Sequence, residues 1–474
     1  MGSPLSRGLR KMRGLWREKS GKEHSLDDRA LGKIRTQLRE CASGIGGEVA
    51  ARQRARRLGE SYLKLDRAGR HAFLRLIATE FGPDPARIEA AHTDYQKSLG
   101  APSQWEAEAR LWSALRSPRA RILTQFNALP QGVRFLIDLR VDLLHFLKDD
   151  TELASLDREL EHILRAWFDV GFLELRRITW QSSASLLEKL MRYEAVHSID
   201  SWSDLKNRLD SDRRCYGFFH PRMPDEPLIF VEVALTGRLA GNVRDLLDEK
   251  APLFDAHSAN SAIFYSISNT QQGLRGVSFG HFLLKRVIED LRRDFPRLKQ
   301  FSTLSPLPAL RKWTEKTPEI WGDVFSADDL ARIGKALGRG APIAREALPE
   351  FLWNAEWTEN ERLTRALGAP LVRLAARYLL LARNDEGRPL DPVARFHLGN
   401  GARVERLNVC ADTSEKGMRQ SFGVMVNYLY DTERIEENVE NLLREGRIAA
   451  SPAVRHAARR GKSGEEVGGA AGIM

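Results

Sequence analysis

The chain has 474 residues, of which 42% are hydrophobic and 29% charged, and its formal net charge is +10. This length is enough for two or three domains with separate cores, and no apolar run reaches the roughly 18 residues of a membrane span. Basic residues are interleaved with Glu and Asp, without a zinc finger, an RNA-recognition signature or a long Lys/Arg block. We therefore expect a globular protein with no membrane span and no nucleic-acid partner, whose surplus positive charge suits a phosphate-rich ligand.

The cysteines and the two chain ends give a further prediction about location. Cys41, Cys215 and Cys410 are far apart, odd in number and without a metal-ligand spacing, which favours a reducing compartment and no metal site. Residues 1–25 are rich in Arg and Lys but lack a clear amphipathic or Ser-rich run. We interpret them as a disordered basic tail of a cytoplasmic protein, with mitochondrial import as the less favoured alternative. Residues 461–474, rich in Gly and Ala, are expected to be a flexible tail.

Residues 26–166 are predicted to form an all-helical domain. Asp66, the pair Asp84-Pro85 and a capping box from Ser103 to Glu106 are typical helix start signals. Leucines then recur at three- and four-residue spacing, which places them on one helix face: Leu136, Leu139, Leu143 and Leu147. No residue set in this region has a chemical pattern, so we expect it to serve in packing and in homo-oligomerisation as a dimer or tetramer.

Residues 167–460 alternate between strand and helix patterns. Short apolar runs rich in β-branched residues predict strands near residues 227–235, 262–267, 300–304 and 403–409. A helix is expected at about 279–293, a helical insertion with four tryptophans follows the third strand, and a last helix begins near Glu436. This succession predicts a separate domain with an α/β layer.

A glycine-containing loop lies between the second predicted strand and the helix that follows it. Glycines let a pyrophosphate approach the main chain, and a helix start adds exposed N–H groups and a positive dipole end. The segment from Arg275 to Gly280 resembles the acyl-CoA loop of GNAT-type acetyltransferases, with Ser278 where a glycine is usual. This loop contains neither a GxGxxG pattern nor a GK[ST] pattern. The loop therefore predicts binding of an acyl-CoA.

Four blocks in the same order resemble the malonyl-CoA decarboxylase family over roughly residues 160 to 435: FYSISNTQQGLRGVSFGHFLLKRVIEDLRRDFP, FSTLSPLPALRKW, DPVARFHLGNGARVERLN and NYLYD. The resemblance implies a helical bundle followed by a GNAT-like (acyl-CoA N-acyltransferase-like) α/β catalytic domain. It also implies conversion of malonyl-CoA to acetyl-CoA and CO₂ without a metal or an organic cofactor, in a homo-oligomer.

The resemblance also implies site residues. Ser305, in the Leu-Ser-Pro segment, and His397, in the Phe-His-Leu-Gly-Asn-Gly-Ala segment, match the catalytic pair of the family. Tyr430 matches a tyrosine near the active site. The malonyl-CoA contact loop corresponds to Arg275, Gly276, Val277, Ser278, Phe279, Gly280 and His281. Some relatives carry a glutamate at the position of Ser278, so this chain departs from the pattern there.

The chemistry of decarboxylation suits these residue types. Loss of CO₂ leaves negative charge on a thioester enolate, which backbone N–H groups or a hydroxyl can stabilise. A histidine that titrates near neutral pH can then protonate the α-carbon as a general acid. Ser305, before Pro306, can bind the carboxylate or relay a proton with His397. Two alternatives remain: an acyltransferase that uses the same loop, and a non-catalytic acyl-CoA sensor. Incubation with malonyl-CoA and no acceptor separates them, because only a decarboxylase releases CO₂.

Overall fold

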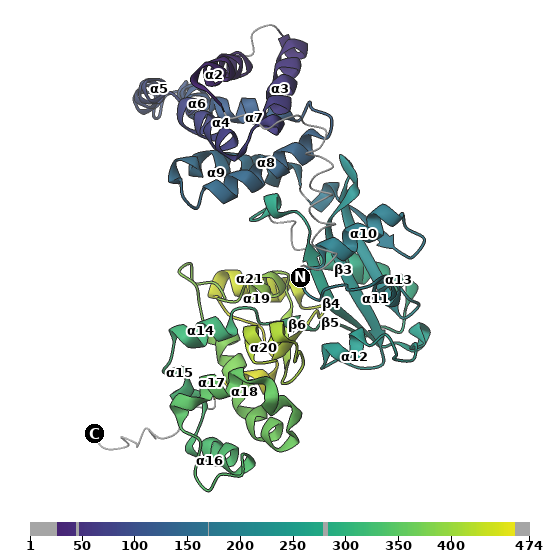
Figure 1. Ribbon diagram of the computed structural model, residues 1–474. Coiled ribbons are helices and arrows are strands. Elements are labelled where there is room, and N and C mark those ends of the chain that lie inside the picture. The colour runs from purple at the N-terminus through teal and green to yellow at the C-terminus, as the bar shows by residue number, and fades with distance from the viewer. Residues whose placement is uncertain (1–25, 44–46, 169, 278–282, 460–474) are drawn as a thin grey trace, which may run out of the picture. The chain divides into compact units, whose positions relative to one another are not determined.

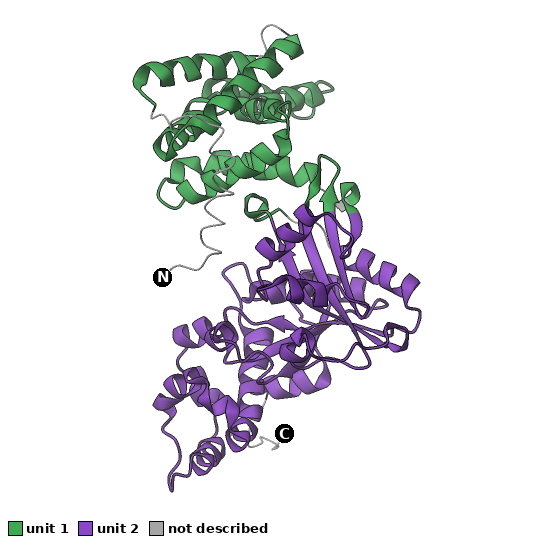
Figure 2. Cartoon of the chain, turned by 45° about the vertical axis from the view of Figure 1, so that its right-hand side comes forward, with its two compact units in different colours: residues 1–174, 219–227, 271–279 green, residues 175–218, 228–270, 280–474 purple. Residues whose placement is uncertain are grey.

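The computed structural model describes residues 26–43, 47–168, 170–277 and 283–459. The chain divides into two compact units (Figure 2), of which unit 1 comprises residues 1–174, 219–227 and 271–279 and unit 2 comprises the remaining residues. Unit 1 thus combines the N-terminal region with two segments from later in the chain. The two predicted tails, 1–25 and 461–474, lie outside the described residues.

The regular elements of the N-terminal region are all helices in the part that the structure describes, as predicted, and short connections separate them (Figure 1). Its α-helices are α2 (Asp28–Ser43), α3 (Gly47–Lys64), α4 (Arg67–Glu80), α5 (Pro85–Lys97), α6 (Gln104–Leu115), α7 (Pro118–Phe126), α8 (Gly132–Phe146) and α9 (Ala154–Trp167). Leu136, Leu139 and Leu143 are buried on α8, as their spacing indicates, whereas Leu147 is the residue after the helix and is half-buried.

All three predicted helix starts are correct, since α6 also begins directly after Ser103. Asp66 accepts a hydrogen bond from the backbone N–H of Gly69 at 2.7 Å, and Asp84 caps α5, which begins with Pro85. The predicted capping box at Ser103 is wrong, because the Ser103 side chain makes no capping bond. Its φ of −85° and ψ of 3° differ from the extended conformation that lets an N-cap hydroxyl reach the helix N–H groups.

An eight-stranded sheet, most of whose residues belong to unit 2, carries the α/β part. Its strands are β1 (Glu174–Ile178), β2 (Arg213–His220), β3 (Met223–Thr236), β4 (Ser261–Asn269), β5 (Gln300–Thr303), β6 (Ser305–Pro306), β7 (Arg403–Asn408) and β8 (Met425–Leu429). They lie in the order β1-β2-β3-β4-β5-β8-β6, and β7 pairs with β8. The four predicted strands correspond to β3, β4, β5 and β7.

The sequence did not indicate β1, β2, β6 or β8 as strands. β2 is the clearest case, because it is buried at all of its positions and begins with Arg213 and Arg214. A strand buried on both faces shows no alternation of polar and apolar residues. The two-residue β6 is too short for any periodicity.

The helices of unit 2 pack around this sheet or form the predicted helical insertion, which lies between β6 and β7 in the chain (Figure 1). They are α10 (Ala184–Tyr193), α11 (Trp202–Arg208), α12 (Val243–Leu247), α13 (Leu283–Asp294), α14 (Leu310–Lys316), α15 (Ile320–Val324), α16 (Ala327–Ala336), α17 (Leu348–Trp353), α18 (Glu361–Leu381), α19 (Pro392–Gly399), α20 (Glu415–Ser421), α21 (Ile435–Glu445) and α22 (Pro452–Arg459). Of the helix predicted at 279–293, the described part begins at Leu283. The helix predicted near Glu436 begins at Ile435, but it is not the last one, because α22 follows it.

The strand β4 has neighbours of opposite direction on its two sides. It pairs antiparallel with β3 and parallel with β5, and the short 3₁₀ helix η4 (Gln272–Leu274) and α13 connect β4 to β5. The parallel pairing covers only Ser261 to Phe264. Beyond it the chain turns from β5 into β6, which pairs with β8.

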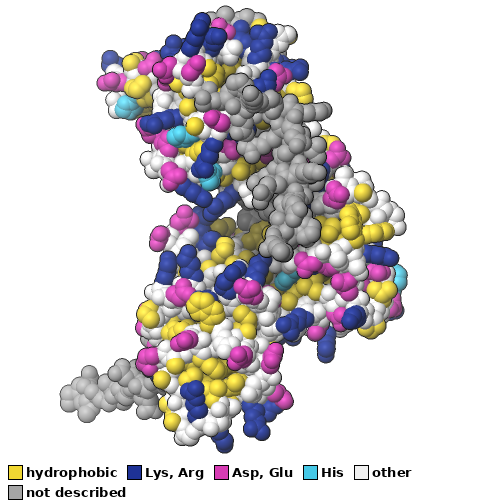
Figure 3. Space-filling model, in the orientation of Figure 1, with side chains coloured by type: hydrophobic (Ala, Val, Ile, Leu, Met, Phe, Trp, Pro, Cys, Tyr) yellow, Lys and Arg dark blue, Asp and Glu magenta, His cyan; other side chains and the backbone are white. Residues whose placement is uncertain are grey.

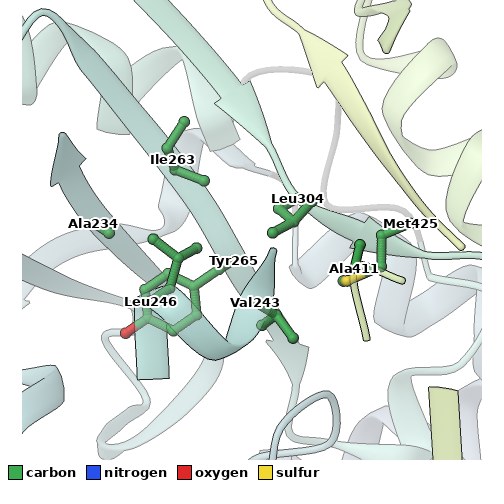
Figure 4. Close-up of a cluster of buried hydrophobic side chains, with 8 residues drawn as sticks. All are labelled: Ala234, Val243, Leu246, Ile263, Tyr265, Leu304, Ala411 and Met425. Carbon is green, nitrogen blue, oxygen red and sulfur yellow. The ribbon is translucent and has the colours of Figure 1, made fainter. Parts of the chain in front are cut away.

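An apolar cluster anchors this turn (Figure 4). Leu304, at the junction of β5 and β6, is fully buried and packs with Ile263 and Tyr265 of β4 and with Met425 of β8. The backbone N–H of Leu304 also donates to the carbonyl of Phe264 at 3.0 Å. Because Leu304 is fixed by packing and by a hydrogen bond, the residue that follows it has a defined direction.

No helix among the described residues is long and apolar enough to cross a bilayer. On the face that Figure 3 displays, Lys and Arg side chains are interspersed with Asp and Glu. Among the described side chains on that face, the basic residues do not form one continuous patch.

Candidate active site

The helix α19 carries His397 in its last turn, and Asp391 fixes where this helix begins. One oxygen of Asp391 accepts hydrogen bonds from the backbone N–H groups of Val393 and Ala394 at 2.9 and 3.0 Å. Its other oxygen accepts a bond from the hydroxyl of Tyr378, on α18, at 2.9 Å. Because the start of α19 is capped and bonded to α18, the position of His397 along the helix is fixed within the core.

A glycine turn ends the same helix. Gly401 has a φ of +80°, a conformation that favours glycine, and a Cβ at this position would lie 2.5 Å from the carbonyl oxygen of Ile435 on α21. The side-chain amide of Asn438, also on α21, donates to the carbonyl of Gly401 at 2.9 Å. Gly401, in the motif after His397, therefore serves the close packing of α19 and α21.

Ser305 lies on β6, at the point where the apolar cluster fixes the chain. It pairs with Val426 of β8 and is only 6% exposed. Its Oγ lies 3.2 Å from Nε2 of His397 and donates a hydrogen bond to Oγ1 of Thr303 at 2.8 Å. The structure thus brings together two residues that are 92 positions apart in the sequence.

A hydrogen-bonded chain of side chains results, and its proton positions follow from the donor count. The single hydroxyl proton of Ser305 is directed to Thr303, so Nε2 of His397 is the donor toward Ser305. In a neutral imidazole the other ring nitrogen is then an acceptor. Accordingly, the hydroxyl of Tyr430, 2.7 Å from Nδ1 of His397, donates to that nitrogen.

Burial keeps this chain uncharged. His397 is 3% exposed, and burial lowers its pKa to about 3. Burial also raises the pKa of Tyr430 well above its usual value. The expectation that this histidine titrates near neutral pH is wrong for the protein alone, because burial acts without an opposing charge on the imidazole.

Two further residues of this site were missed by the sequence reasoning. Oγ1 of Thr303 also accepts the backbone N–H of Tyr428 at 3.1 Å, and the ring of Tyr428 stacks on the imidazole of His397 with centroids 4.6 Å apart. A sequence signal existed, since Thr303 and Tyr428 lie two residues before Ser305 and Tyr430, and residues two apart on a strand share a face. The hydroxyl of Tyr428 is buried without a hydrogen-bond partner among the described residues.

The predicted acyl-CoA loop is described in part. Arg275 is exposed, Gly276 has a φ of +84°, and Val277 is buried. Ser278, Phe279, Gly280 and His281 lie outside the described residues. The described part of the loop belongs to unit 1, whereas Ser305, His397 and Tyr430 belong to unit 2.

A protein metal site requires several acidic, histidine or cysteine side chains close together. Within the ranges that the structure describes, no group of three or more of them is arranged to hold a metal ion. The described cysteines are all unpaired.

Comparisons with known proteins cover both parts of the chain. The family pattern described as the malonyl-CoA decarboxylase C-terminal domain matches residues 171–467, and the one described as the N-terminal domain matches residues 81–168. A relative from Mus musculus, named malonyl-CoA decarboxylase, mitochondrial, is 37% identical over 445 residues. That match spans 90% of this chain and 86% of the relative.

Solved structures agree with this result. A malonyl-CoA decarboxylase from Rhodopseudomonas palustris is 40% identical, with a TM-score of 0.79, over 90% of this chain and 99% of that one. A malonyl-CoA decarboxylase from Cupriavidus metallidurans is 44% identical, with a TM-score of 0.71, over 90% and 100% of the two chains. The chain therefore belongs to the malonyl-CoA decarboxylase family.

Proposed function

We infer that this protein is a carboxy-lyase that converts malonyl-CoA to acetyl-CoA and CO₂. The observation that carries the mechanism is the buried chain Tyr430–His397–Ser305–Thr303, with 2.7, 3.2 and 2.8 Å between successive polar atoms. Such a chain can deliver a proton into a site from which water is excluded, which is what an enolate needs after CO₂ has left.

We propose that Ser305 faces the substrate and that His397 supplies the proton. The bond between the α-carbon and the carboxylate carbon breaks, and its electron pair passes into the thioester enolate. The hydroxyl of Ser305 protonates the α-carbon while Nε2 of His397 returns a proton to Ser305. The overall reaction consumes one proton, so His397 must take up a proton from solvent, as the substrate binds, before this step.

The negative charge of the substrate carboxylate can stabilise the protonated form of His397. In the protein alone, burial holds the pKa of His397 at about 3. A carboxylate bound beside the pair favours the imidazolium, because an opposite charge offsets the effect of burial. When CO₂ leaves, this charge moves onto the enolate, and the proton follows it. The unpaired buried hydroxyl of Tyr428 is a candidate donor to the enolate oxygen.

We further propose that the loop 275–281 binds the phosphate groups of CoA. The left-handed Gly276 and the exposed Arg275 support this role. The α/β domain is proposed to be GNAT-like, which the parallel pair β4–β5 and its connection through α13 support. Domain limits of 26–166 and 167–460 remain our proposal.

Assembly and location are proposed on separate grounds. We propose a homo-oligomer that forms through the helical domain, supported by the exposed side chains of Trp105 and Trp112 on α6. Light scattering of a Trp112→Lys variant tests it, since an unchanged mass would contradict this surface. We propose a cytoplasmic location, supported by the unpaired cysteines. Imaging the full chain beside residues 26–474 tests whether the first 25 residues direct mitochondrial import.

The decisive experiment compares two histidines. His397→Ala should abolish CO₂ release from malonyl-CoA without an acceptor, while binding of CoA, measured by calorimetry, stays within about threefold, because chemistry and remote binding are separate contributions. The matched control is His162→Ala, at an exposed histidine of α9. Turnover near the wild-type rate in the His397 variant would remove this residue from the mechanism.

A further inference from the structure

A buried arginine of unit 1 holds the backbone of the predicted acyl-CoA loop. Arg140, on α8, is 1% exposed. Its Nη1 donates to the carbonyl oxygens of Gly273 and Arg275, at 3.0 and 2.7 Å. These two carbonyls are two residues apart, so one guanidinium nitrogen fixes the curvature of the chain just before Gly276.

The guanidinium itself cannot turn away from the loop. Its Nε and Nη2 donate to Asp157 and Glu161, both on α9, with shortest distances of 2.8 and 2.9 Å. A guanidinium presents its N–H groups in one rigid plane, and here all three nitrogens are engaged. The two carboxylates therefore determine the direction from which Arg140 reaches the loop.

A second arginine and the helix backbone enclose the same segment. Nη2 of Arg165 donates to the carbonyl of Gly276 at 3.1 Å and to Glu161 at 2.6 Å. A Cβ on Gly273 would lie 2.0 Å from the carbonyl oxygen of Ile137, so α8 packs directly on the loop backbone. The carbonyls of the loop are thus held from the side of the helical domain.

The charges in this cluster matter for an anionic ligand. A Cβ on Gly276 would lie 3.3 Å from an oxygen of Glu161, so this carboxylate is adjacent to the loop. Left unpaired, it would repel a phosphate group. Arg140 and Arg165 both pair with it, which removes that repulsion.

We propose that Arg140 is a positioning residue that presets the backbone of residues 273–276 to receive the phosphate groups of CoA. The proposal rests on the acyl-CoA role of the loop given above and assigns the helical region a part in substrate binding that acts through this loop. Arg140 acts through the loop carbonyls and touches no reacting atom.

The test replaces Arg140 by a residue that has the same charge but a different hydrogen-bonding geometry. Arg140→Lys retains the cation but cannot join two carbonyls to two carboxylates. We expect the Kd of CoA and the KM of malonyl-CoA to rise about tenfold, as for the loss of charge-assisted hydrogen bonds, with kcat within about twofold. Malonyl-pantetheine lacks the nucleotide phosphates, so its kcat/KM should change less than about twofold.

The matched control is Arg134→Met, which removes an arginine of the same helix that pairs with Asp138 and Glu226. We expect it to leave the Kd of CoA unchanged. An unchanged Kd for CoA in Arg140→Lys, or an equal loss with malonyl-pantetheine, overturns the proposal.

If Arg140→Lys does not fold, Arg165→Met decides the matter. Arg165 is exposed and holds one loop carbonyl, so we expect a two- to threefold weaker binding of CoA, about the effect of one exposed hydrogen bond. Unchanged binding there also overturns the proposal. CoA binding requires no turnover, so a wild-type protein that binds CoA but releases no CO₂ refutes the proposed reaction while this test still stands.

Discussion

The Ser305–His397 group of unit 2 and the Arg140 cluster of unit 1 are both buried and hydrogen-bonded. They differ in charge, because the first group is neutral and the second consists of ion pairs. Burial removes the charge of His397, whose pKa falls to about 3. Arg140, a guanidinium at 1% exposure, is paired with the carboxylates of Asp157 and Glu161. A buried group without an opposing charge becomes neutral, whereas one between carboxylates remains an ion.

The difference in charge between the two groups suits them to different functions. A neutral chain of hydroxyls and an imidazole can shift protons when a substrate carboxylate arrives, because its state responds to a new charge. A paired ionic cluster does not respond in this way, since breaking it leaves an uncompensated charge in the core. The first arrangement suits proton transfer, and the second suits holding a backbone in place.

After the loss of activity expected for His397→Ala, the largest effect is that of Ser305→Ala. The hydroxyl that we propose as the proton carrier is lost, so kcat should fall about 10²- to 10⁴-fold, the usual contribution of a positioned proton donor. Steady-state assays of CO₂ release measure it. Ser302→Ala is the matched control, at a buried serine of β5 whose hydroxyl bonds to the carbonyl of Tyr428, and it should change kcat little. Equal losses in both variants would mean that the strand, and not the hydroxyl, matters.

The corresponding change in unit 1 is Gly273→Ala. The added Cβ meets the carbonyl of Ile137 at 2.0 Å, so the free energy of unfolding should fall by about 1–3 kcal/mol, as in other overpacked sites. Denaturant unfolding measures it. The control is Gly368→Ala, on α18, where nothing lies within 4 Å of the new Cβ. That variant should be as stable as the wild type or more so, and a destabilised control would refute the steric explanation.

The third effect is a pH dependence of stability. His397 has a folded-state pKa of about 3 and an ordinary unfolded value near 6.5, so the unfolded chain binds more protons between these values. Its contribution to stability is complete above pH 6.5 and should decrease by roughly 1 kcal/mol for each pH unit below it. Denaturant unfolding of the wild type and His397→Gln at pH 7.5 and 5.5 measures the difference. Parallel losses in both proteins would contradict the buried neutral histidine.

The smallest expected effect is that of Thr303→Val. It removes the acceptor that orients the hydroxyl of Ser305, and one hydrogen bond contributes about 0.5–1.5 kcal/mol, which corresponds to a fall of about two- to tenfold in kcat. Thr303→Ser keeps the acceptor and should restore most of the activity. A loss in both variants would indicate that packing at this position, and not the hydrogen bond, is responsible.

Local patterns in the sequence determined much of the secondary structure. Asp66 and Asp84 mark true helix starts, and the apolar runs that became β3, β4, β5 and β7 were read as strands, because capping and strand periodicity depend on near neighbours. The ordered motifs also determined the family. The resemblance named Ser305, His397 and Tyr430, which the structure places within hydrogen-bond distance of one another along a chain.

Only the tertiary structure decided the properties that depend on distant contacts. The low pKa of His397 results from its complete burial, which no nearby residue in the sequence indicates. The hydrogen bond from Arg140 to the carbonyl of Gly273 joins residues 133 positions apart. The strand β2 is recognisable as a strand only within its sheet. Burial and partner choice are set by the packing of the whole chain, and they determine which of the residues that the sequence named are charged and which are held in place.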